Sequence, residues 1–146
     1  MQALLAFREP IVKQGKFFAA VGDAKISAVD VRDIASVAAT ALTEEGHVGR
    51  TYDLSGPEAP THCEMAEKLS KAVGREIQYV DVSEEAMMAA LLSVGLPPWQ
   101  VDGLIEDYAH YRRGEASSIA SGIQDATAMQ PKSFADFARD YAPAFC

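Results

Sequence analysis

Cysteines, basic clusters and long apolar runs are all scarce in this sequence, and each scarcity argues against a class of protein. Only two cysteines occur, Cys63 and Cys146, so we expect no disulfide framework and a reduced, cytoplasmic setting. The formal net charge is −8, and no stripe of Lys and Arg is present to displace the counterions of nucleic acid. No apolar run approaches the roughly 18 residues of a membrane span, and the first residues lack the basic region of a secretory signal.

A glycine-rich phosphate loop is also missing, although the predicted elements follow the order of a nucleotide-binding α/β protein. Three strand-like runs, Lys25–Asp30, Arg50–Ser55 and Glu76–Val82, alternate with helical patterns at 31–42 and 62–73. Strands joined through helices usually pair in parallel by right-handed crossovers. The first such turn normally holds the cofactor phosphates. We find no such turn and therefore assign no cofactor-binding residue.

Capping signals support both predicted helices. Asp30 with Asp33 resembles a capping box before the first helix, and Thr61 with Glu64 forms a T-x-x-E box before the second, which Gly74 ends. The first helix carries one apolar stripe, of the kind that normally faces a core. Its members are Val31, Ile34, Ala35, Ala38, Ala39 and Leu42.

The two ends of the chain differ in pattern. Phe17–Val21 is an apolar extended run, and Gly22-Asp23 is a turn signal before the next run, which predicts a small antiparallel hairpin. From Ser83 onward the pattern is helical, with Ser117-Ser118 as the expected start of the helix after Gly114. We therefore expect a single α/β domain with three parts. They are a lead-in with a short strand over 1–24, a βαβαβ unit over 25–82 and a helical region over 83–146.

Four short motifs, in their order and spacing, resemble one known family. They are Val29–Ala35 (VDVRDIA), Tyr52–Glu58 (YDLSGPE), Glu64–Ala66 with Gly74-Arg75, and Pro131–Phe137 (PKSFADF). The sequence resembles the C-terminal part of NmrA-like proteins, atypical members of the short-chain dehydrogenase/reductase superfamily. The resemblance covers nearly all of this chain but only about half of a family member.

The resemblance implies an NAD(P)-binding family of quinone reductases, related oxidoreductases and redox-sensing regulators. It implies a partial Rossmann-like fold with about three strands, a short hairpin strand and a helical C-terminal substrate lobe. NAD or NADP is implied by the family alone, because its glycine-rich turn lies in the half without a counterpart here. Met1-Gln2 resembles a segment bordering the nicotinamide, but Ala3 stands where that segment often has Asn. Thr127–Met129 replaces a frequent Thr-Gly-Arg or Thr-Gly-Lys.

No residue is assigned a catalytic role. The wider superfamily uses Tyr-x-x-x-Lys, in which lysine lowers the pKa of the tyrosine. The nearest match places Arg112 after Tyr108, late in the chain, and a structural aromatic stripe explains it better.

No metal or phosphate site is expected either. His62–Glu64 has the H-x-E spacing of zinc deaminases but no P-C-x-x-C follows. Glu106, Asp107 and His110 fit a solvated helix face. Gly46–Gly49 precedes a strand-like run instead of following one, and fits a loop.

Aromatic residues form the one candidate binding site. An apolar pocket for a flat ring such as a quinone is predicted from Phe7, Phe17, Phe18, Trp99 and Tyr108. Core packing explains the same residues at least as well, since aromatics at helical spacing usually face inward.

Three interpretations stay open at this stage, and two of them assign a function. In the first, the chain is the substrate lobe of an NmrA-like NAD(P)-dependent oxidoreductase and is not catalytic alone. In the second, it is a non-enzymatic regulatory or interaction module. Without a Rossmann half, the run 50–55 exposes an unpaired edge beside a bare apolar surface. We therefore expect a homo-oligomer. A truncated product whose only property is folding is a third interpretation.

Overall fold

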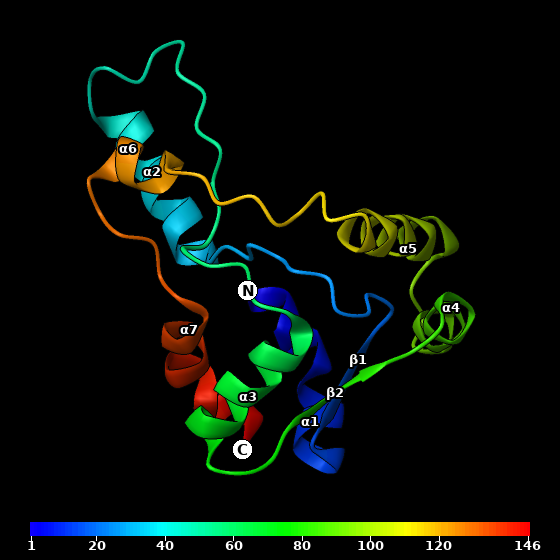
Figure 1. The fold of residues 1–146 in the computed structure, drawn as a ribbon. Coiled ribbons are helices and arrows are strands. Elements are labelled where there is room, and N and C mark those ends of the chain that lie inside the picture. The colour runs from blue at the N-terminus through cyan, green and yellow to red at the C-terminus, as the bar shows by residue number, and fades with distance from the viewer.

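The computed structural model describes all residues 1–146 and has a mixed α/β fold, as predicted (Figure 1). Short 3-10 helices lie near both ends, and seven α-helices surround one pair of strands. In chain order the elements are η1 (Gln2–Phe7), α1 (Arg8–Gln14), β1 (Lys16–Ala19), α2 (Val31–Thr43), α3 (His62–Val73), β2 (Gln78–Asp81), α4 (Glu84–Ser93), α5 (Pro98–Arg112), α6 (Gly122–Thr127), α7 (Phe134–Tyr141) and η2 (Ala142–Phe145). None of the helices has the length and apolar character that crossing a membrane requires.

The two strands pair with each other in parallel. Their register runs from Lys16 opposite Gln78 to Ala19 opposite Asp81. The predicted antiparallel hairpin is therefore wrong, because β1 pairs with a strand about sixty residues further on. The parallel pairing lets Phe17 pack among residues of α1, α3 and α7 until 1% of it is exposed. A two-stranded hairpin alone is only marginally stable in water and buries far less.

Two of the three predicted strands are extended segments without a ladder. The segment 25–30 has a single isolated bridge, between Lys25 and Thr61. The segment 50–55 has no strand partner, although its burial alternates, with Tyr52 and Leu54 inward and Thr51 and Asp53 exposed. A ladder needs a neighbouring strand about 4.8 Å away, and β1 and β2 already pair with each other. Of the predicted three, only the run 76–82 becomes a strand.

The capping predictions are largely confirmed. The Thr61 and Glu64 side chains make both bonds of the capping box at α3, and Gly74 takes the left-handed conformation at its end. At α2, Asp30 accepts a hydrogen bond from the backbone N–H of Arg32. Asp33 does not complete a box there. Its carboxylate accepts instead from the backbone N–H of Lys132, over 2.7 Å.

The segment 115–132 contains one helix, α6, which begins at Gly122 and not at the predicted Ser117-Ser118. A Cβ at position 122 would lie 2.2 Å from the carbonyl oxygen of Asp53. The helix therefore begins where a glycine lets its backbone approach the extended segment 50–55. This requirement is tertiary, and capping signals in the sequence do not reveal it.

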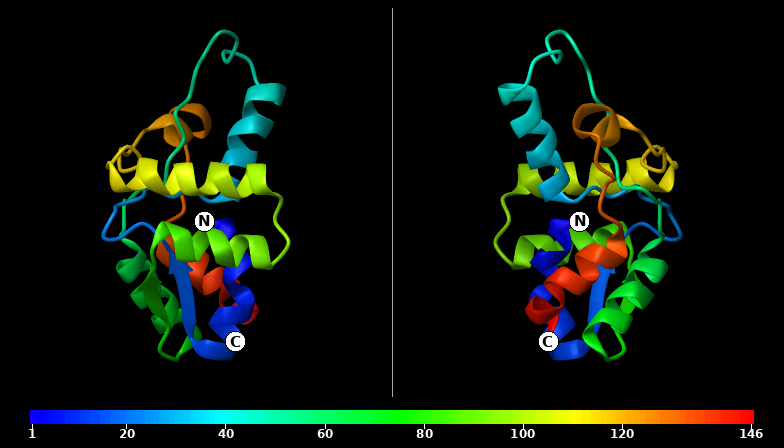
Figure 2. Two further views of the ribbon diagram at one scale, coloured as in Figure 1. Left: turned by 90° about the vertical axis from the view of Figure 1, so that its right-hand side faces the viewer. Right: turned by 90° about the vertical axis from the view of Figure 1, so that its left-hand side faces the viewer.

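Three core clusters occupy three parts of the molecule (Figures 1 and 2). The largest joins α1, α3, α7 and one side of β1, with Phe17, Phe134, Phe137 and Phe145 fully buried. The second joins α4 and α5 to the residues that follow β1. The third joins α2 and α6 and buries only Val37, Ile123 and Ala126. The third region is the least enclosed of the three.

Candidate functional site

A group of hydrogen-bonded polar residues lies at the carboxyl ends of β1 and β2. Asp81 is its shared acceptor. Ligands of parallel α/β folds gather at this end of the strands. The Asp81 carboxylate accepts hydrogen bonds from the backbone N–H groups of Val21 (3.2 Å) and Gly22 (2.8 Å). It also accepts from the hydroxyl of Tyr79 (2.7 Å). The bond from Tyr79, followed by that from Gly22, lowers the pKa of the Asp81 carboxyl.

Tyr79 reaches this centre because residues two apart on a strand lie on the same side. Its hydroxyl also lies 3.1 Å from the carbonyl oxygen of Ala19, at the end of β1. Burial, followed by the hydrogen bond to Asp81, raises the pKa of the Tyr79 hydroxyl above its usual range. The phenol therefore keeps its proton at neutral pH and acts as a hydrogen-bond donor.

His62 is the third member of this group. It is the first residue of α3, and its ring centroid lies 5.1 Å from that of Tyr79 and 6.0 Å from that of Phe17. Its Nδ1 atom is buried without a hydrogen-bond partner. Burial lowers the pKa of the imidazole to about 4, against the opposing effect of the Asp81 charge. The ring is therefore neutral at pH 7.

This group of three can donate and accept hydrogen bonds, but it lacks the parts of a proton-transfer site. The proton of Tyr79 is directed to Asp81 and not to His62, and no lysine hydrogen-bonds to the phenol. No cluster of three His, Cys, Asp or Glu side chains is arranged to hold a metal ion. We therefore describe it as a polar support for the turn after β1.

An open depression of about 520 Å³ lies on the other side of Tyr79. It lies between α3 and β2 and is lined by Cys63, Ala66, Glu67, Ser70, Lys71, Glu76, Ile77, Gln78 and Tyr79. Cys63, one of the lining residues, is exposed. The lining is mixed in charge and wide open, which suits solvent better than an enclosed apolar ligand.

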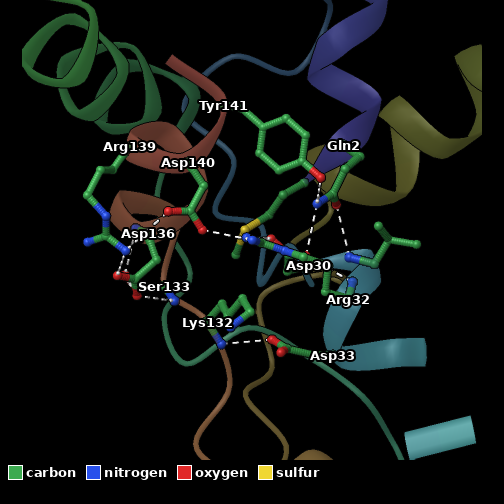
Figure 3. A network of polar contacts seen from close by, with 12 residues as sticks. Gln2, Asp30, Arg32, Asp33, Lys132, Ser133, Asp136, Arg139, Asp140 and Tyr141 are labelled. Carbon is green, nitrogen blue, oxygen red and sulfur yellow. Dashed lines mark hydrogen bonds and ion pairs between the residues drawn. The ribbon is translucent and has the colours of Figure 1, made fainter. Parts of the chain in front are cut away.

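A second polar network joins the start of the chain to α2 (Figure 3). The Asp30 side chain is fully buried and accepts from Nε and Nη2 of Arg32, over 2.9 and 2.8 Å. The side-chain amide of Gln2 donates to Asp30 and accepts from the backbone N–H of Val31, each over 2.9 Å. Bonds from Arg32 hold the pKa of the Asp30 carboxyl far below its usual range.

The same network continues into α7. Arg32 pairs with Asp140 over 2.7 Å, and its guanidinium lies 5.4 Å from the ring centre of Tyr141 (Figure 3). Both ends of the Gln2 amide are occupied by protein groups. In this structure the network is a joint between η1, α2 and α7, in which the Gln2 amide bonds to protein groups through both its nitrogen and its oxygen.

The five aromatic residues of the predicted pocket do not converge on one cavity. Phe7 and Phe17 pack together in the first cluster, with ring centroids 6.4 Å apart. Phe18 and Tyr108 pack against the second cluster. Trp99 is 75% exposed. The pocket as a whole stays a prediction, and the pair in the second cluster is the part that lies beside the strand ends.

Trp99 borders a shallow depression of about 390 Å³ on the outer face of α5. Its lining is acidic and polar, comprising Trp99, Gln100, Gly103, Leu104, Glu106, Asp107 and His110. Glu106 and Asp107 are exposed, and His110 pairs with Glu115. This agrees with the predicted solvated helix face.

Tyr108 and Arg112, the two ends of the Tyr-x-x-x-Arg motif on α5, both make contacts that hold helices together. Tyr108 packs against the second cluster, with its ring 6.2 Å from that of Tyr111. Arg112 pairs with Glu84 and donates to the carbonyl oxygen of Ala20. The arginine therefore ties α5 to α4 and to the end of β1.

Sequence reasoning missed the association of Tyr79, Asp81 and His62. The signal was the alternation of Tyr79 and Asp81 at the end of a predicted strand, which places both on one side. The position of His62 beside them depends on how α3 packs on β2, and no local pattern encodes that.

Comparison with known proteins places this geometry in a wider context. No family model matches the chain. An NAD(P)H azoreductase from Xenophilus azovorans is 35% identical over 145 residues, covering 99% of this chain and 51% of that protein. Quinone oxidoreductase 2 from Escherichia coli is 38% identical over 102 residues, covering 70% of this chain and 36% of that protein.

Solved structures agree with these relatives. The chain superposes on an NADPH-dependent quinone oxidoreductase from Escherichia coli with a TM-score of 0.84 and 29% identity, covering 95% of this chain and 50% of that chain. The NADPH complex of that enzyme gives a TM-score of 0.82 and 30% identity, covering 93% of this chain and 48% of that one. Residues 1–146 thus span about half the length of the proteins they match, corresponding to the C-terminal half.

Proposed function

Because this chain is homologous to the C-terminal halves of NAD(P)-binding reductases, we propose that it forms the acceptor-binding half of an NAD(P)H-dependent oxidoreductase. Its acceptors are flat conjugated molecules such as quinones. The observation that carries the proposal is 35% identity to an NAD(P)H azoreductase, maintained over 99% of this chain. The superposition on a quinone oxidoreductase supports the same reading.

Cofactor phosphates do not fit the helix starts of this chain. A phosphate binds at a helix N-terminus where free backbone N–H groups and the helix dipole attract negative charge. Six α-helices carry acidic side chains in their first turn: Glu9, Asp33, Glu64, Glu84 with Glu85, Asp125 and Asp136. The remaining helix, α5, begins with Pro98, which has no N–H. We therefore propose that the isolated chain does not hold NAD(P)H and is not catalytic alone.

Acceptor binding is assigned to the region where β1 ends beside α5. Phe18 and Tyr108 lie there, and Tyr111 is next to Tyr108. Burial raises the pKa of the Tyr108 and Tyr111 hydroxyls, so both remain protonated at neutral pH. A protonated phenol can donate a hydrogen bond to a quinone oxygen, while the aromatic rings stack on its flat face.

The experiment is a nuclear magnetic resonance titration of the labelled chain with 1,4-naphthoquinone. The proposal expects saturable amide shifts that cluster at the end of β1 and along α5. The variant Tyr108→Leu should weaken binding, and Tyr52→Leu, in the third region, should not. Shifts that are absent, or that cluster only on α3, would remove the assignment.

A second candidate is a non-catalytic interaction module. Its supporting observation is the extended segment 50–55, which has no strand partner. The same titration separates the two candidates, because an interaction module should show no saturable quinone binding.

A further inference from the structure

Arg112 is the last residue of α5, and its guanidinium reaches two other parts of the fold. One terminal nitrogen donates to the carbonyl oxygen of Ala20, directly after β1, and the other pairs with the carboxylate of Glu84. Glu84 is the first residue of α4. A planar guanidinium can direct donors at two acceptors at once, whereas an ammonium group is a compact point charge on a flexible stem. One side chain therefore joins α5 both to α4 and to the end of β1.

The segment that follows β1 is held through both kinds of backbone group. Asp81 accepts from the N–H groups of Val21 and Gly22. On the acceptor side, Arg112 donates to the carbonyl oxygen of Ala20, to which no backbone N–H group bonds. Ala20 and Val21 are buried, and a buried carbonyl oxygen requires a donor. The guanidinium meets that requirement from α5.

The helices α4 and α5 pack mainly against each other. The short link 94–97 joins them at one end, and the pair of Arg112 with Glu84 joins them at the other (Figure 2). This pairing also suits the helix dipoles, because the acid lies in a first turn and the base in a last turn. The second cluster connects both helices to the end of β1 and the residues after it. The bond from Arg112 to Ala20 is the one hydrogen bond from α5 to that segment.

Aromatic residues of the proposed acceptor region lie on both sides of this bond. Phe18 belongs to β1, and Tyr108 lies four residues before Arg112 on α5. Side chains four apart on a helix share one face. Phe18 and Tyr108 both pack against the second cluster. A movement of α5 relative to the end of β1 therefore changes how the two rings lie relative to each other, and stacking on a flat ligand depends on that placement.

We propose that Arg112 is a positioning residue for acceptor binding. It holds the C-terminal turn of α5 on the end of β1 and thereby sets the placement of Tyr108 relative to Phe18. Its effect on the acceptor is indirect and passes through Tyr108. This role rests on the proposed function, whereas the placement of α5 by Arg112 does not require it.

The placement of α5 is tested first, without an acceptor. Arg112→Met keeps the apolar part of the side chain and removes both bonds. The amide signal of Val21 reports on the hydrogen bond to the preceding carbonyl oxygen, so nuclear magnetic resonance should show it displaced in Arg112→Met, together with the signals of residues 104–111. Arg113→Met is the matched control, because it removes the neighbouring guanidinium, which is exposed and pairs with Glu115. It should leave the Val21 signal in place.

The same chains are then titrated with 1,4-naphthoquinone, under conditions in which urea denaturation shows each of them to be folded. Arg112→Met should raise the Kd at least about fivefold. Arg112→Lys keeps a donor for the carbonyl oxygen of Ala20 and should restore part of the affinity. If Arg112→Met does not fold, Arg112→Lys serves the same comparison, with a smaller rise in Kd expected. Arg113→Met should bind as the original chain does.

A double-mutant cycle tests whether Arg112 acts through Tyr108. In a chain that carries Tyr108→Leu, the further change Arg112→Met should alter the Kd less than about twofold, because the side chain that it positions is absent. An equal effect of Arg112→Met with and without Tyr108 would overturn the proposal.

Two other results would also overturn it. One is an Arg112→Met chain whose Val21 signal and Kd match those of the original, and the other is an equal loss of affinity in Arg113→Met. Absence of quinone binding by the original chain would remove the proposed function itself, and this role of Arg112 with it. Binding by the original chain that Arg112→Met leaves unchanged would remove the role alone.

Discussion

The hydroxyl of Tyr79 donates a hydrogen bond to the carboxylate of Asp81, two residues further along β2, over 2.7 Å. This bond lies at the carboxyl ends of the only paired strands, and the same carboxylate also receives two backbone N–H groups from the turn after β1. Asp81, at the end of β2, therefore holds the turn that follows β1 in place. Val21 of this turn belongs to the second core cluster, against which Phe18 and Tyr108 of the proposed acceptor region also pack.

Asp81→Asn should destabilise the fold. The amide replaces a charged acceptor of three hydrogen bonds, and charge-assisted bonds are roughly twice as strong as neutral ones. We expect a loss of about 1–3 kcal/mol in the free energy of unfolding, measured by urea denaturation. Asp102→Asn, at an exposed site of α5 with no hydrogen-bond partner, should leave stability unchanged. Equal effects at both sites would contradict the role given to Asp81.

His62 should make stability fall in mild acid. Its pKa is about 4 in the folded chain against about 6.5 when unfolded. The unfolded chain therefore binds the proton first, and stability is lost as the pH falls from 6.5 towards 4. Between pH 7 and pH 5 the loss should be about 2 kcal/mol.

The measurement is urea denaturation of the original chain and of His62→Phe at both pH values. The amino terminus and the carboxylates titrate in both proteins and cancel in the comparison. The variant should lose about 2 kcal/mol less than the original over this interval. Identical pH dependence in the two proteins would refute the buried, neutral imidazole.

Replacement of glycine by alanine should lower stability at position 122 and raise it at position 103. Gly122→Ala places a methyl group 2.2 Å from the carbonyl oxygen of Asp53, which requires the backbone to move and should cost at least about 2 kcal/mol. Gly103→Ala meets no atom within 4 Å and improves the helix propensity of α5, which should add about 0.5–1 kcal/mol. Thermal unfolding of both variants measures this, and a stabilised Gly122→Ala would show that the close approach is wrong.

Arg32→Ala should leave the buried Asp30 carboxylate without its guanidinium partner. Gln2 and the backbone N–H of Arg32's position remain as donors, so we expect a loss of about 2–3 kcal/mol. Arg139→Ala removes an exposed guanidinium that pairs with Asp136 and Asp140 on the surface and should change little. Chemical denaturation compares the two. Similar losses would place the stabilising effect on the surface of α7 instead of at Asp30.

Local signals predicted the helices well because their starts and ends carry side chains that satisfy specific backbone groups. Thr61 with Glu64 makes the bonds that their spacing predicts. Strands were harder to predict, because a strand forms only where a second strand lies beside it to share hydrogen bonds. The segment 50–55 has the alternation of a strand but no neighbour to pair with.

The candidate site was harder still to predict. The aromatic pocket stays a prediction, because its members are divided: Phe7 and Phe17 lie in one core cluster, Phe18 and Tyr108 beside another, and Trp99 in neither. This division follows from the parallel pairing of β1 and β2, which the sequence pattern did not reveal. The stripe of α2 was identified correctly as apolar, whereas its outward orientation depends on Asp33 and Val37 packing towards α6. Periodicity gives the faces of a helix, and tertiary contacts decide which face is buried.

The most direct test of the central claim is a calorimetric titration of NADPH into the purified chain. We expect no saturable heat of binding, because acidic side chains occupy the first turns of six α-helices and α5 begins with a proline. Saturable binding at a stoichiometry near one NADPH per chain would contradict it, and would show that these 146 residues hold the cofactor themselves.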